Sequence, residues 1–565
     1  MNTALSEAFA LHQQGDLIAA KTKYQAVLEK NPQEFEGLVL LAMLLIQEKE
    51  YTDALSYFLK AEKEAPTHPQ IQVHLANTYK LLENFELALQ HYQKALTLKP
   101  DYAEAHHNLA NLYAQLQNNQ NAIVHYEKAI ALQPNYIAAY NHLALLHLRQ
   151  NNTHLAKNHF KIVHNSEPHN VLANYHLGNF ALEENALSEA LSYYEQGLNG
   201  DVNYIPLLTN LAATHLKLGN KDKAIMLYKH ILQIDEADAV THMNLAAVYL
   251  LDKNDRLAIK HYSLVLQLDE NNFNAHFNLG TIFMGKESYD MASSHFQTAV
   301  ALLPENADAH YNYATCLLKQ NLPQTALHHL RQALKLAPDN AIFKFRLAAV
   351  SGEDNPARPP VEYIRTLFDR YAERFDKDLL QSLQYKAPEL LCALLKEPLA
   401  PIVNPIVVDI GCGTGLCGEH LQHLGAQLIG IDLSPGMLAI AKDKRVYQEL
   451  IEGDIAEILN NHYFHADALI AADVWIYFGD LSHLLQQALK QVKSGGFLAF
   501  SCEEGDKDDN TFHLSPTGRY QHGRTYIANL LAATGWHLLA DPQAILREQQ
   551  GVPVVGRLYL CQKSV

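Results

Sequence analysis

Three glycines and three carboxylates in the last third of the chain have types and spacing that could do chemistry. The glycines alternate with other residues in one short loop: Gly411, Gly413 and Gly415. Asp409 stands just before that loop, and Asp432 and Asp454 each follow a later apolar run. Glycine lets a backbone approach a ligand closely, and carboxylates accept hydrogen bonds from hydroxyl and ammonium groups. The pattern indicates a loop that holds a polar small molecule.

The elements that must position these residues alternate between strands and helices. Apolar runs predict strands at 406–410, 427–433, 447–453, 466–472 and 496–502, with later strands at 536–541 and 558–562. Helical patterns cover 416–424, 435–444, 481–492 and 525–533. Such alternation predicts an α/β domain with a parallel, doubly wound, Rossmann-like sheet. Ligands bind such sheets at the carboxyl ends of the strands, where the loop and the acids fall.

The loop spacing is G-x-G-x-G, whereas dinucleotide folds use G-x-G-x-x-G. With its acids, it resembles motifs one to three of the class I S-adenosylmethionine-dependent methyltransferases. The resemblance implies that Asp432, with Leu433, binds the ribose of S-adenosylmethionine. It places Asp454 and Ile455 at the adenine edge and Asp409 near the ammonium group. Two alternatives are a Rossmann-like domain without a cofactor and a nicotinamide enzyme.

Further stretches resemble bacterial methyltransferases that carry tetratricopeptide repeats. They are residues 367–377, 473–481 and 518–527. In related enzymes an N-terminal aromatic segment folds over the cofactor, so the resemblance makes Tyr371 and Phe375 candidate lid residues and adds Asp473 to the cofactor site. Alternatively, these aromatic residues only pack a helix onto the sheet.

The methyl acceptor is not specified by the sequence. The fourth strand leads into Asp473-Val474-Trp475-Ile476-Tyr477, which is not the Asn/Asp-Pro-Pro-Tyr/Phe signature of base and glutamine methylation. Five side chains in the right segments could act as a base: Tyr477, Glu503, His513, His522 and Tyr526. No spacing singles one of them out, so no catalytic residue is assigned.

Residues 1–340 repeat with a period of 34. Position 20 of the unit is alanine in every copy, from Ala20 to Ala326. Position 24 is aromatic in all copies but the last, and position 32 is proline except at Val202, Glu236 and Glu270. Small and aromatic residues one turn apart let two helices pack closely, and proline ends the second helix. The pattern resembles ten tetratricopeptide repeats and predicts an α-solenoid, with the helix ends less certain at the three exceptions.

Several domain boundaries follow from these patterns. We expect the repeats at 1–340, a capping helix at 341–351, a linker rich in proline at 352–360 and the class I methyltransferase domain at 361–565.

Position 6 of the repeat carries a row of polar side chains. The row contains Asn108, Asn210, Asn244, Asn278 and Asn312, with His74, His142 and His176. Amides can pair with the backbone of an extended peptide, and the row resembles the asparagine ladder of O-linked N-acetylglucosamine transferases. We therefore expect a protein or peptide partner there; alternatively the row is only a hydrated face.

Composition limits the remaining classes. A net charge of −17 disfavours a general nucleic-acid binder. No long uncharged apolar run, no signal-like segment at 1–7 and no zinc or disulfide spacing occur, so we expect a cytoplasmic protein without membrane contact or metal. The main hypothesis is a methyltransferase whose repeats recruit a protein. A non-catalytic scaffold and a small-molecule methyltransferase with repeats used for assembly remain open, as does the oligomeric state.

Overall fold

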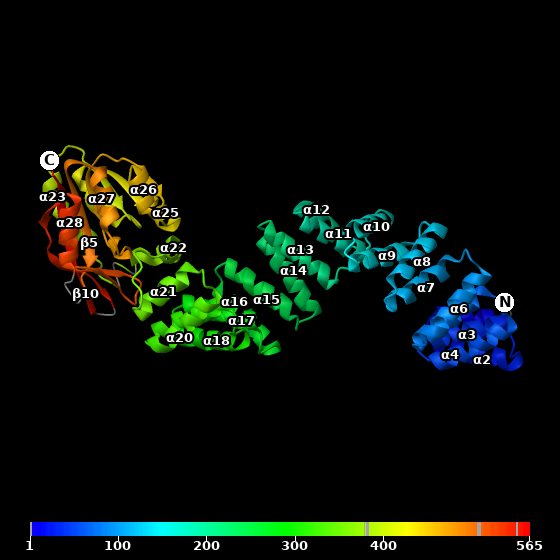
Figure 1. The fold of residues 1–565 in the computed structure, drawn as a ribbon. Coiled ribbons are helices and arrows are strands. Elements are labelled where there is room, and N and C mark those ends of the chain that lie inside the picture. The colour runs from blue at the N-terminus through cyan, green and yellow to red at the C-terminus, as the bar shows by residue number, and fades with distance from the viewer. Residues whose placement is uncertain (1–2, 378, 380–382, 506–509, 550–551, 565) are drawn as a thin grey trace. The chain divides into compact units, whose positions relative to one another are not determined.

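The computed structural model describes residues 3–377, 379, 383–505, 510–549 and 552–564. Its contacts divide the chain into two compact units, residues 1–268 and residues 269–565. The first unit holds helices only, and the second holds further helices followed by a mixed sheet (Figure 1). No helix in the described ranges is long and apolar enough to cross a membrane.

The first unit is a series of paired helices, two for each 34-residue repeat. Their bounds are α1 Thr3–Gln13, α2 Leu17–Lys30, α3 Phe35–Gln47, α4 Tyr51–Glu64, α5 Pro69–Leu81, α6 Phe85–Leu98, α7 Ala103–Gln115, α8 Asn119–Leu132, α9 Ile137–Arg149, α10 Thr153–Ser166, α11 Val171–Glu183, α12 Leu187–Leu198, α13 Ile205–Lys217, α14 Lys221–Ile234, α15 Ala239–Leu251 and α16 Asp255–Leu268.

The repeat positions predicted to pack do so. Every position-20 alanine is fully buried, and every aromatic ring at position 24 is buried too. The hydroxyl of Tyr126 donates to Oδ1 of Asn111 at 2.6 Å, and Tyr194 donates to Asn179 at 2.7 Å. These bonds satisfy the buried phenols, so the ring can fill the gap between helices without an unpaired polar group.

Two other repeat positions shape the helix ends. Position 15, between the two helices, has a positive φ in all ten copies, from Gly15 to Asn321. Helices α14 and α16 end as the other second helices do, although Glu236 and Glu270 replace proline. Only α12 ends early, at Leu198, with Gly197 and Gly200 beside its end. Glycine has low helix propensity, so the sequence around it explains the shorter helix.

The second unit begins with the last repeats and continues into the α/β domain. Its first helices are α17 Phe273–Gly285, α18 Tyr289–Leu302, α19 Ala307–Lys319, α20 Pro323–Leu336 and α21 Ala341–Ser351. Helices α22 Val361–Lys377 and α23 Ala387–Leu399 precede the sheet. The predicted capping helix corresponds to α21, where Phe343 and Phe345 are buried.

The strands form one sheet in the order β3-β2-β1-β4-β5-β10-β8. Their bounds are β1 Ile406–Ile410, β2 Gln427–Asp432, β3 Glu449–Glu452, β4 Ala466–Ala471, β5 Val492–Glu503, β6 Phe512–Leu514, β7 Tyr520–His522, β8 Trp536–Ala540, β9 Gln543–Gln549 and β10 Val552–Lys563. Between them lie α24 Leu416–Leu421, α25 Pro435–Lys444, α26 Ile455–Asn461, α27 Ser482–Gln491 and α28 Arg524–Thr534. Apolar clusters on both faces bury the central strands.

The sheet is parallel from β1 to β5, and the short β7 also pairs parallel with β5. Strand β10 runs antiparallel to β5, and β8 and β9 run antiparallel to β10. The doubly wound prediction is therefore confirmed for β1–β5, while the C-terminal strands make the sheet mixed. The sequence pattern does not predict strands β6, β7 and β9, because each is short or mostly polar.

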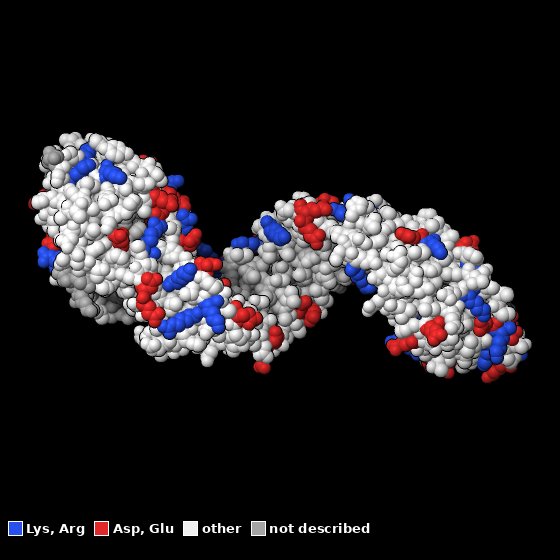
Figure 2. All heavy atoms as spheres, in the orientation of Figure 1, with Lys and Arg blue, Asp and Glu red and all other residues white. Residues whose placement is uncertain are grey.

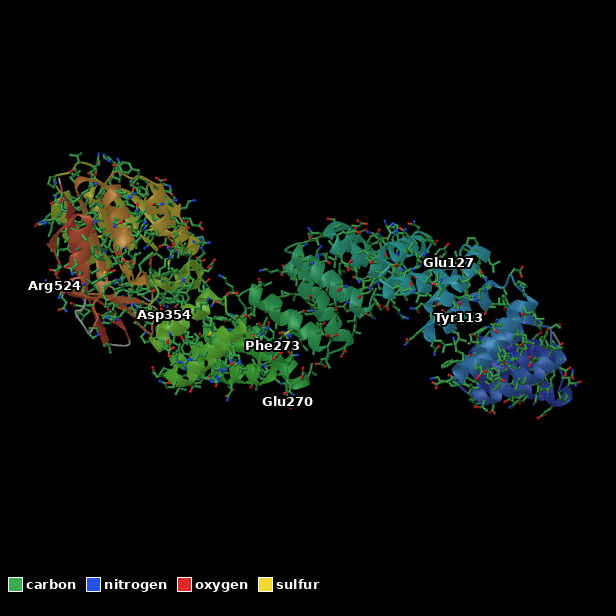
Figure 3. The ribbon with its side chains drawn as sticks, viewed as in Figure 1. Tyr113, Glu127, Glu270, Phe273, Asp354 and Arg524 are labelled. Carbon is green, nitrogen blue, oxygen red and sulfur yellow. The ribbon has the colours of Figure 1, made fainter. Side chains whose placement is uncertain are left out.

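The segment predicted as a linker is bonded to the α/β domain. Asn355 exchanges two bonds with β6, donating to the carbonyl of Phe512 at 2.8 Å and accepting from the N–H of Leu514 at 3.0 Å. The Tyr520 hydroxyl donates to the carbonyl of Pro356 at 2.6 Å, and Asp354 in the same segment is labelled in Figure 3. Residues 352–360 therefore form a strap that joins the last repeats to the α/β domain and is fixed to that domain by hydrogen bonds. The last repeats and the α/β domain belong to one compact unit.

Candidate cofactor and acceptor site

The glycine loop follows β1 and has a backbone that favours glycine. Gly411, Gly413 and Gly415 have φ values of +66°, +53° and +93°. A Cβ on Gly411 would lie 2.4 Å from Cγ2 of Val474, whereas one on Gly413 would be no closer than 3.7 Å to Phe375. Gly411 therefore packs closely against Val474, which follows β4, and the backbone of Gly413 has free space beside it for a ligand.

Asp432 ends β2 and is held beside this loop. Its Oδ2 accepts from the N–H of Gly413 at 2.8 Å, and its Oδ1 accepts from the N–H of Ser434 at 2.8 Å. Burial raises the pKa of Asp432, and these backbone donors oppose that rise. A carboxylate has about four acceptor sites, so two bonds leave capacity for the two hydroxyls of a ribose.

Asp409 lies below the loop and is fully buried. The hydroxyl of Tyr447 donates to its Oδ2 at 2.5 Å. Burial raises the pKa of Asp409 to about 7, the Tyr447 bond opposes this, and the charge of Asp432 adds to it. Its predicted place near a ligand ammonium group stays a prediction, since the bond shown goes to Tyr447.

Asp454 begins α26 at the end of β3. Its Oδ1 accepts from the N–H groups of Ala456 and Glu457, and its Oδ2 pairs with Arg358 at 3.1 Å. The carboxylate therefore caps the helix and anchors the strap. Ile455 is buried next to it. Their predicted contact with adenine stays a prediction.

Helix α22 lies across the loop and the start of α25. The hydroxyl of Thr414 donates to Asp376, which also pairs with Lys444 at 2.8 Å. Asp369 accepts from the hydroxyl of Ser434 at 2.5 Å. The sequence singles out this segment for its aromatic residues, yet these two acids make the polar contacts. Acids spaced seven apart on one helix face were the signal that could have found them.

The aromatic residues of α22 also face the site. Phe375 lies nearest to Gly413, and its ring centroid is 6.0 Å from that of Tyr371. The ring of Phe368 lies edge-on to Tyr477, with centroids 5.4 Å apart. Helix α22 thus packs against both the glycine loop and the segment after β4, and its role as a lid stays a prediction.

A buried charged cluster lies at the carboxyl ends of β4 and β5. Arg547 donates to Asp473 at 2.5 Å and to Glu503, and Arg519 pairs with Glu503 at 3.6 Å. Asp473 has a φ of +55°, and its Oδ1 also accepts from the hydroxyl of Ser501 at 2.8 Å. Strained residues persist where surrounding contacts over-determine them, often at active sites. Arg547 could not be found from the sequence pattern, because that pattern does not predict β9.

Two of the candidate bases, His522 and Glu503, make hydrogen bonds within the protein. Nε2 of the buried His522 donates to the carbonyls of Phe478 and Gly479, and burial lowers its pKa to about 4. Glu503 is committed to Arg547. Nδ1 of His522 is buried and has no hydrogen-bond partner among the described residues, whereas Glu503 is paired with arginines. Neither residue is assigned as a catalytic base.

The position-6 asparagines are half-buried in both units. Asn210 of repeat seven donates to Oδ1 of Asn179 of repeat six at 2.7 Å, so this amide also joins two neighbouring repeats. Figure 2 shows acidic and basic side chains interspersed on the visible face of the repeats. Peptide binding by the row stays a prediction.

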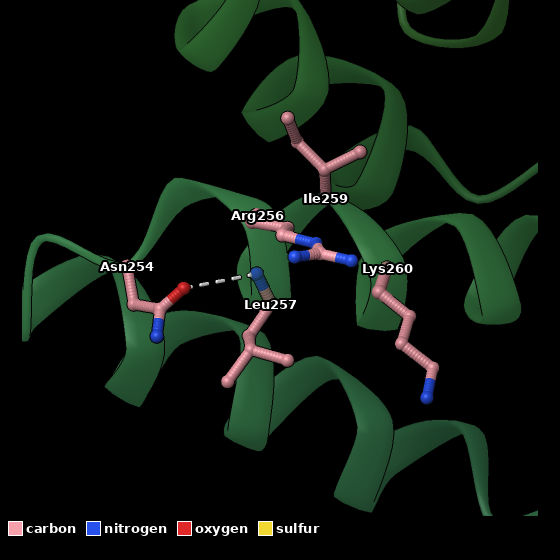
Figure 4. Close-up of a pocket in the computed structure, with 5 residues that line it drawn as sticks. All are labelled: Asn254, Arg256, Leu257, Ile259 and Lys260. Atoms are coloured by element: carbon pink, nitrogen blue, oxygen red, sulfur yellow. Dashed lines mark hydrogen bonds between the residues drawn. The ribbon is translucent and has the colours of Figure 1, made fainter.

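A separate pocket lies at the start of α16. Its lining residues are Asn254, Arg256, Leu257, Ile259 and Lys260 (Figure 4). Oδ1 of Asn254 accepts from the N–H of Leu257 at 3.2 Å, which is a helix N-cap bond. The lining has no carboxylate, thiol or imidazole, so we assign no chemistry to it.

Comparison with known proteins decides the family. The family described as "Methyltransferase domain" matches residues 408–500, and tetratricopeptide repeat families match 6–69, 103–136, 142–201, 205–238 and 277–341. The malonyl-[acyl-carrier protein] O-methyltransferase of Yersinia pestis is 30% identical over 212 residues, 35% of this chain and 76% of that protein. The chain belongs to the class I methyltransferases. Their cofactor, S-adenosylmethionine, is the cofactor of this domain.

Other matches are shorter or more distant. The biotin biosynthesis bifunctional protein BioHC of Saccharophagus degradans is 30% identical over 166 residues, 28% of this chain. The chain spans only 27% of BioHC and 34% of human methyltransferase-like protein 27. A solved magnesium protoporphyrin IX methyltransferase from Synechocystis, with bound S-adenosylmethionine, is 17% identical at a TM-score of 0.29, over 37% of this chain and 100% of that one.

Proposed function

We propose that this protein transfers a methyl group from S-adenosylmethionine to an acceptor that is, or is carried by, a protein recruited by the repeats. The observation that carries the cofactor part is the placement of Asp432. Its carboxylate stands at the carboxyl end of β2 and accepts hydrogen bonds from two backbone N–H groups. The loop beside it has glycines that leave the backbone accessible. A ribose diol and an amino-acid moiety suit these groups.

The roles of the chain's own residues follow from this placement. We assign ribose binding to Asp432 with Leu433, the adenine edge to Asp454 and Ile455, and the loop contacts to Gly411, Gly413 and Gly415. The bound cofactor supplies an already activated methyl group, so the protein mainly has to position the acceptor and exclude water. Helix α22, with Tyr371 and Phe375, would exclude water, Asp473 would complete the cofactor site, and Tyr477 would line the acceptor side.

Recruitment by the repeats is supported by their continuity with the catalytic domain. Arg374 of α22 lies 3.8 Å from Glu287, which follows α17 in the ninth repeat. Asn278 and Asn312 of the row belong to the same compact unit as the site. A partner bound to this row would therefore lie on the element that carries the enzyme, rather than on a detached module.

A small carboxylate acceptor is the second candidate. Arg519 keeps 28% of its side chain exposed, and its partner Glu503 is shared with Arg547. Guanidinium groups bind carboxylates well, and the Yersinia pestis relative acts on a malonyl group by its name. In this case the repeats would serve assembly.

Labelled methyl transfer separates these candidates. The protein is incubated with methyl-labelled S-adenosylmethionine and a cell lysate, and products are sorted by size. Label on protein bands supports recruitment, and label in the small-molecule fraction supports the second candidate. The absence of label in both fractions, with cofactor binding intact, would favour a non-catalytic scaffold.

A further inference from the structure

Four of the repeats contain the same pair of histidines, which the methyltransferase function does not use. Position 4 on the first helix meets position 23 on the second helix through their Nδ1 atoms, at 2.9–3.0 Å. The pairs are His106–His125, His242–His261, His276–His295 and His310–His329. They belong to repeats four, eight, nine and ten, counted in units of 34 from residue 1.

Each pair also reaches the preceding repeat. Nε2 of the position-4 histidine bonds the carbonyl at position 32 of the repeat before it, at 3.0–3.1 Å. Two of these carbonyls belong to Pro100 and Glu270, the latter labelled in Figure 3. One histidine pair therefore ties the two helices of its repeat to the turn that precedes them.

The bonds fix where the protons are. A carbonyl only accepts, so Nε2 of the position-4 ring carries its proton and Nδ1 of that ring is an acceptor. The position-23 ring must then donate from Nδ1. A proton added to Nε2 of the position-23 ring leaves this arrangement intact. A proton added to Nδ1 of the position-4 ring sets two N–H groups against each other, and the pair separates.

We propose that these four pairs are acid-labile joints, which loosen repeats four, eight, nine and ten from the turn that precedes each of them when the pH falls. The proposal is independent of the methyltransferase reaction. It concerns the stability of the surface on which a partner would bind.

The surroundings of the pairs oppose protonation. Burial, with the charge of the partner ring next, lowers the pKa of His125, His261 and His329 to about 4. Among the described residues, Lys128, Lys229 and Lys260 act on the rings in the same direction, and His328 does so on His310 and His329. The phenols of Tyr113, Tyr249 and Tyr313 lie against the position-23 rings.

The direction of the pH effect follows from these shifts. The rings whose extra proton would break the pair are those at position 4, and burial lowers the pKa of His106 and His310 among them. A base whose pKa is lower in the folded state than its ordinary 6.5 contributes stability above that value. This contribution is lost as the pH falls below 6.5.

In two other repeats the position-4 histidine is replaced by an amide side chain, which does not titrate. In repeat three, position 4 is Gln72, whose Oε1 bonds Nδ1 of His91 at 2.8 Å. In repeat six, position 4 is Asn174, whose Nδ2 donates to the carbonyl of Pro168, at position 32, over 2.8 Å. An amide thus makes the same kinds of bond at position 4 and cannot take up the disruptive proton. The matched variant is therefore a glutamine at position 4.

Hydrogen exchange on the full chain, corrected for its intrinsic pH dependence, tests the proposal. Between about pH 7 and about pH 5, the opening of helices in the four paired repeats should increase at least about fivefold. Repeat two has Leu38 and Tyr57 at the paired positions and should change less than about threefold. Equal changes in paired and unpaired repeats would overturn the proposal.

The fourfold variant His106→Gln, His242→Gln, His276→Gln and His310→Gln should lose the acid-dependent opening. A control with four exposed histidines replaced by glutamine, at His154, His169, His420 and His423, should behave as wild type. Persistent acid opening in the first variant would contradict the proposal. If that variant does not fold, the comparison of repeat four with repeat two in the wild-type chain decides alone.

Discussion

The backbone N–H of Gly413 donates a 2.8 Å hydrogen bond to Oδ2 of Asp432. This bond joins the loop after β1 to the end of β2, so the glycine loop and the acid form one unit rather than two separate motifs. The N–H of Ser434 holds the second carboxylate oxygen. The carboxylate is therefore oriented before a ligand arrives, which lowers the entropy cost of binding.

The first prediction compares two alanine substitutions in the loop. Gly411→Ala places a Cβ 2.4 Å from Val474 at a positive φ and should destabilise the methyltransferase domain by about 2–4 kcal/mol. Gly413→Ala meets no close atom and should cost about 1–2 kcal/mol, from its φ alone. The chain's two tryptophans, Trp475 and Trp536, are buried in this domain, so their fluorescence follows its unfolding in urea. Equal losses would contradict the packing argument.

The second prediction concerns the attachment of α22. Asp376→Ala removes the bonds to Thr414 and Lys444 and should weaken binding of S-adenosylhomocysteine about 5- to 10-fold. It should also speed proteolytic cleavage within α22. Asp443→Ala makes the same charge change at an exposed position of α25 and serves as the control. If both variants bind like wild type, α22 is not a lid.

The third prediction separates binding from packing in the asparagine row. The triple change of Asn244, Asn278 and Asn312 to Ala should abolish capture of a partner and leave the melting temperature near wild type. Asn210→Ala should instead lower repeat stability by about 1 kcal/mol, because it removes the bond to Asn179. Affinity capture and circular dichroism measure the two effects. Undiminished capture by the triple variant would leave only a hydrated face.

The fourth prediction follows from burial of Asp409, which raises its pKa to about 7. A carboxyl whose folded pKa is raised favours folding at low pH, and this advantage is lost as the pH rises from 3.8 through about 7. Asp409→Asn should therefore gain stability relative to wild type between about pH 5 and about pH 8, by up to a few kcal/mol. Tryptophan fluorescence during urea unfolding measures it. A stability difference that does not change with pH would contradict the raised pKa of this carboxyl.

The repeats could be predicted almost fully from the sequence. Position 20 stays alanine from Ala20 to Ala326 without insertion, because each copy buries it against the same neighbours. Strands β1, β2, β4 and β5 were predictable for a similar reason, since most residues of their apolar runs are buried. Strand β9 was not predictable because its residues, such as Arg547, are polar and are paired by contacts distant in sequence.

The candidate site was predictable in its residues but not in its bonds. The order Asp409, glycine loop, Asp432 is visible in the sequence, whereas the attachment of Asp376 to Thr414 depends on how α22 packs. Asp454 illustrates the same limit. Its strand-end position was expected, but its pairing with Arg358 across the strap was not.

The central claim is that Asp432 binds the ribose of S-adenosylmethionine, and calorimetric titration with S-adenosylhomocysteine tests it most directly. Hydrogen bonds to a charged group are worth about 1.5–3 kcal/mol each, so Asp432→Ala should weaken binding roughly 10- to 150-fold. The triple asparagine variant, with an unchanged cofactor site, should bind like wild type. No binding by wild type at millimolar ligand, or equal binding by wild type and Asp432→Ala, would contradict the account.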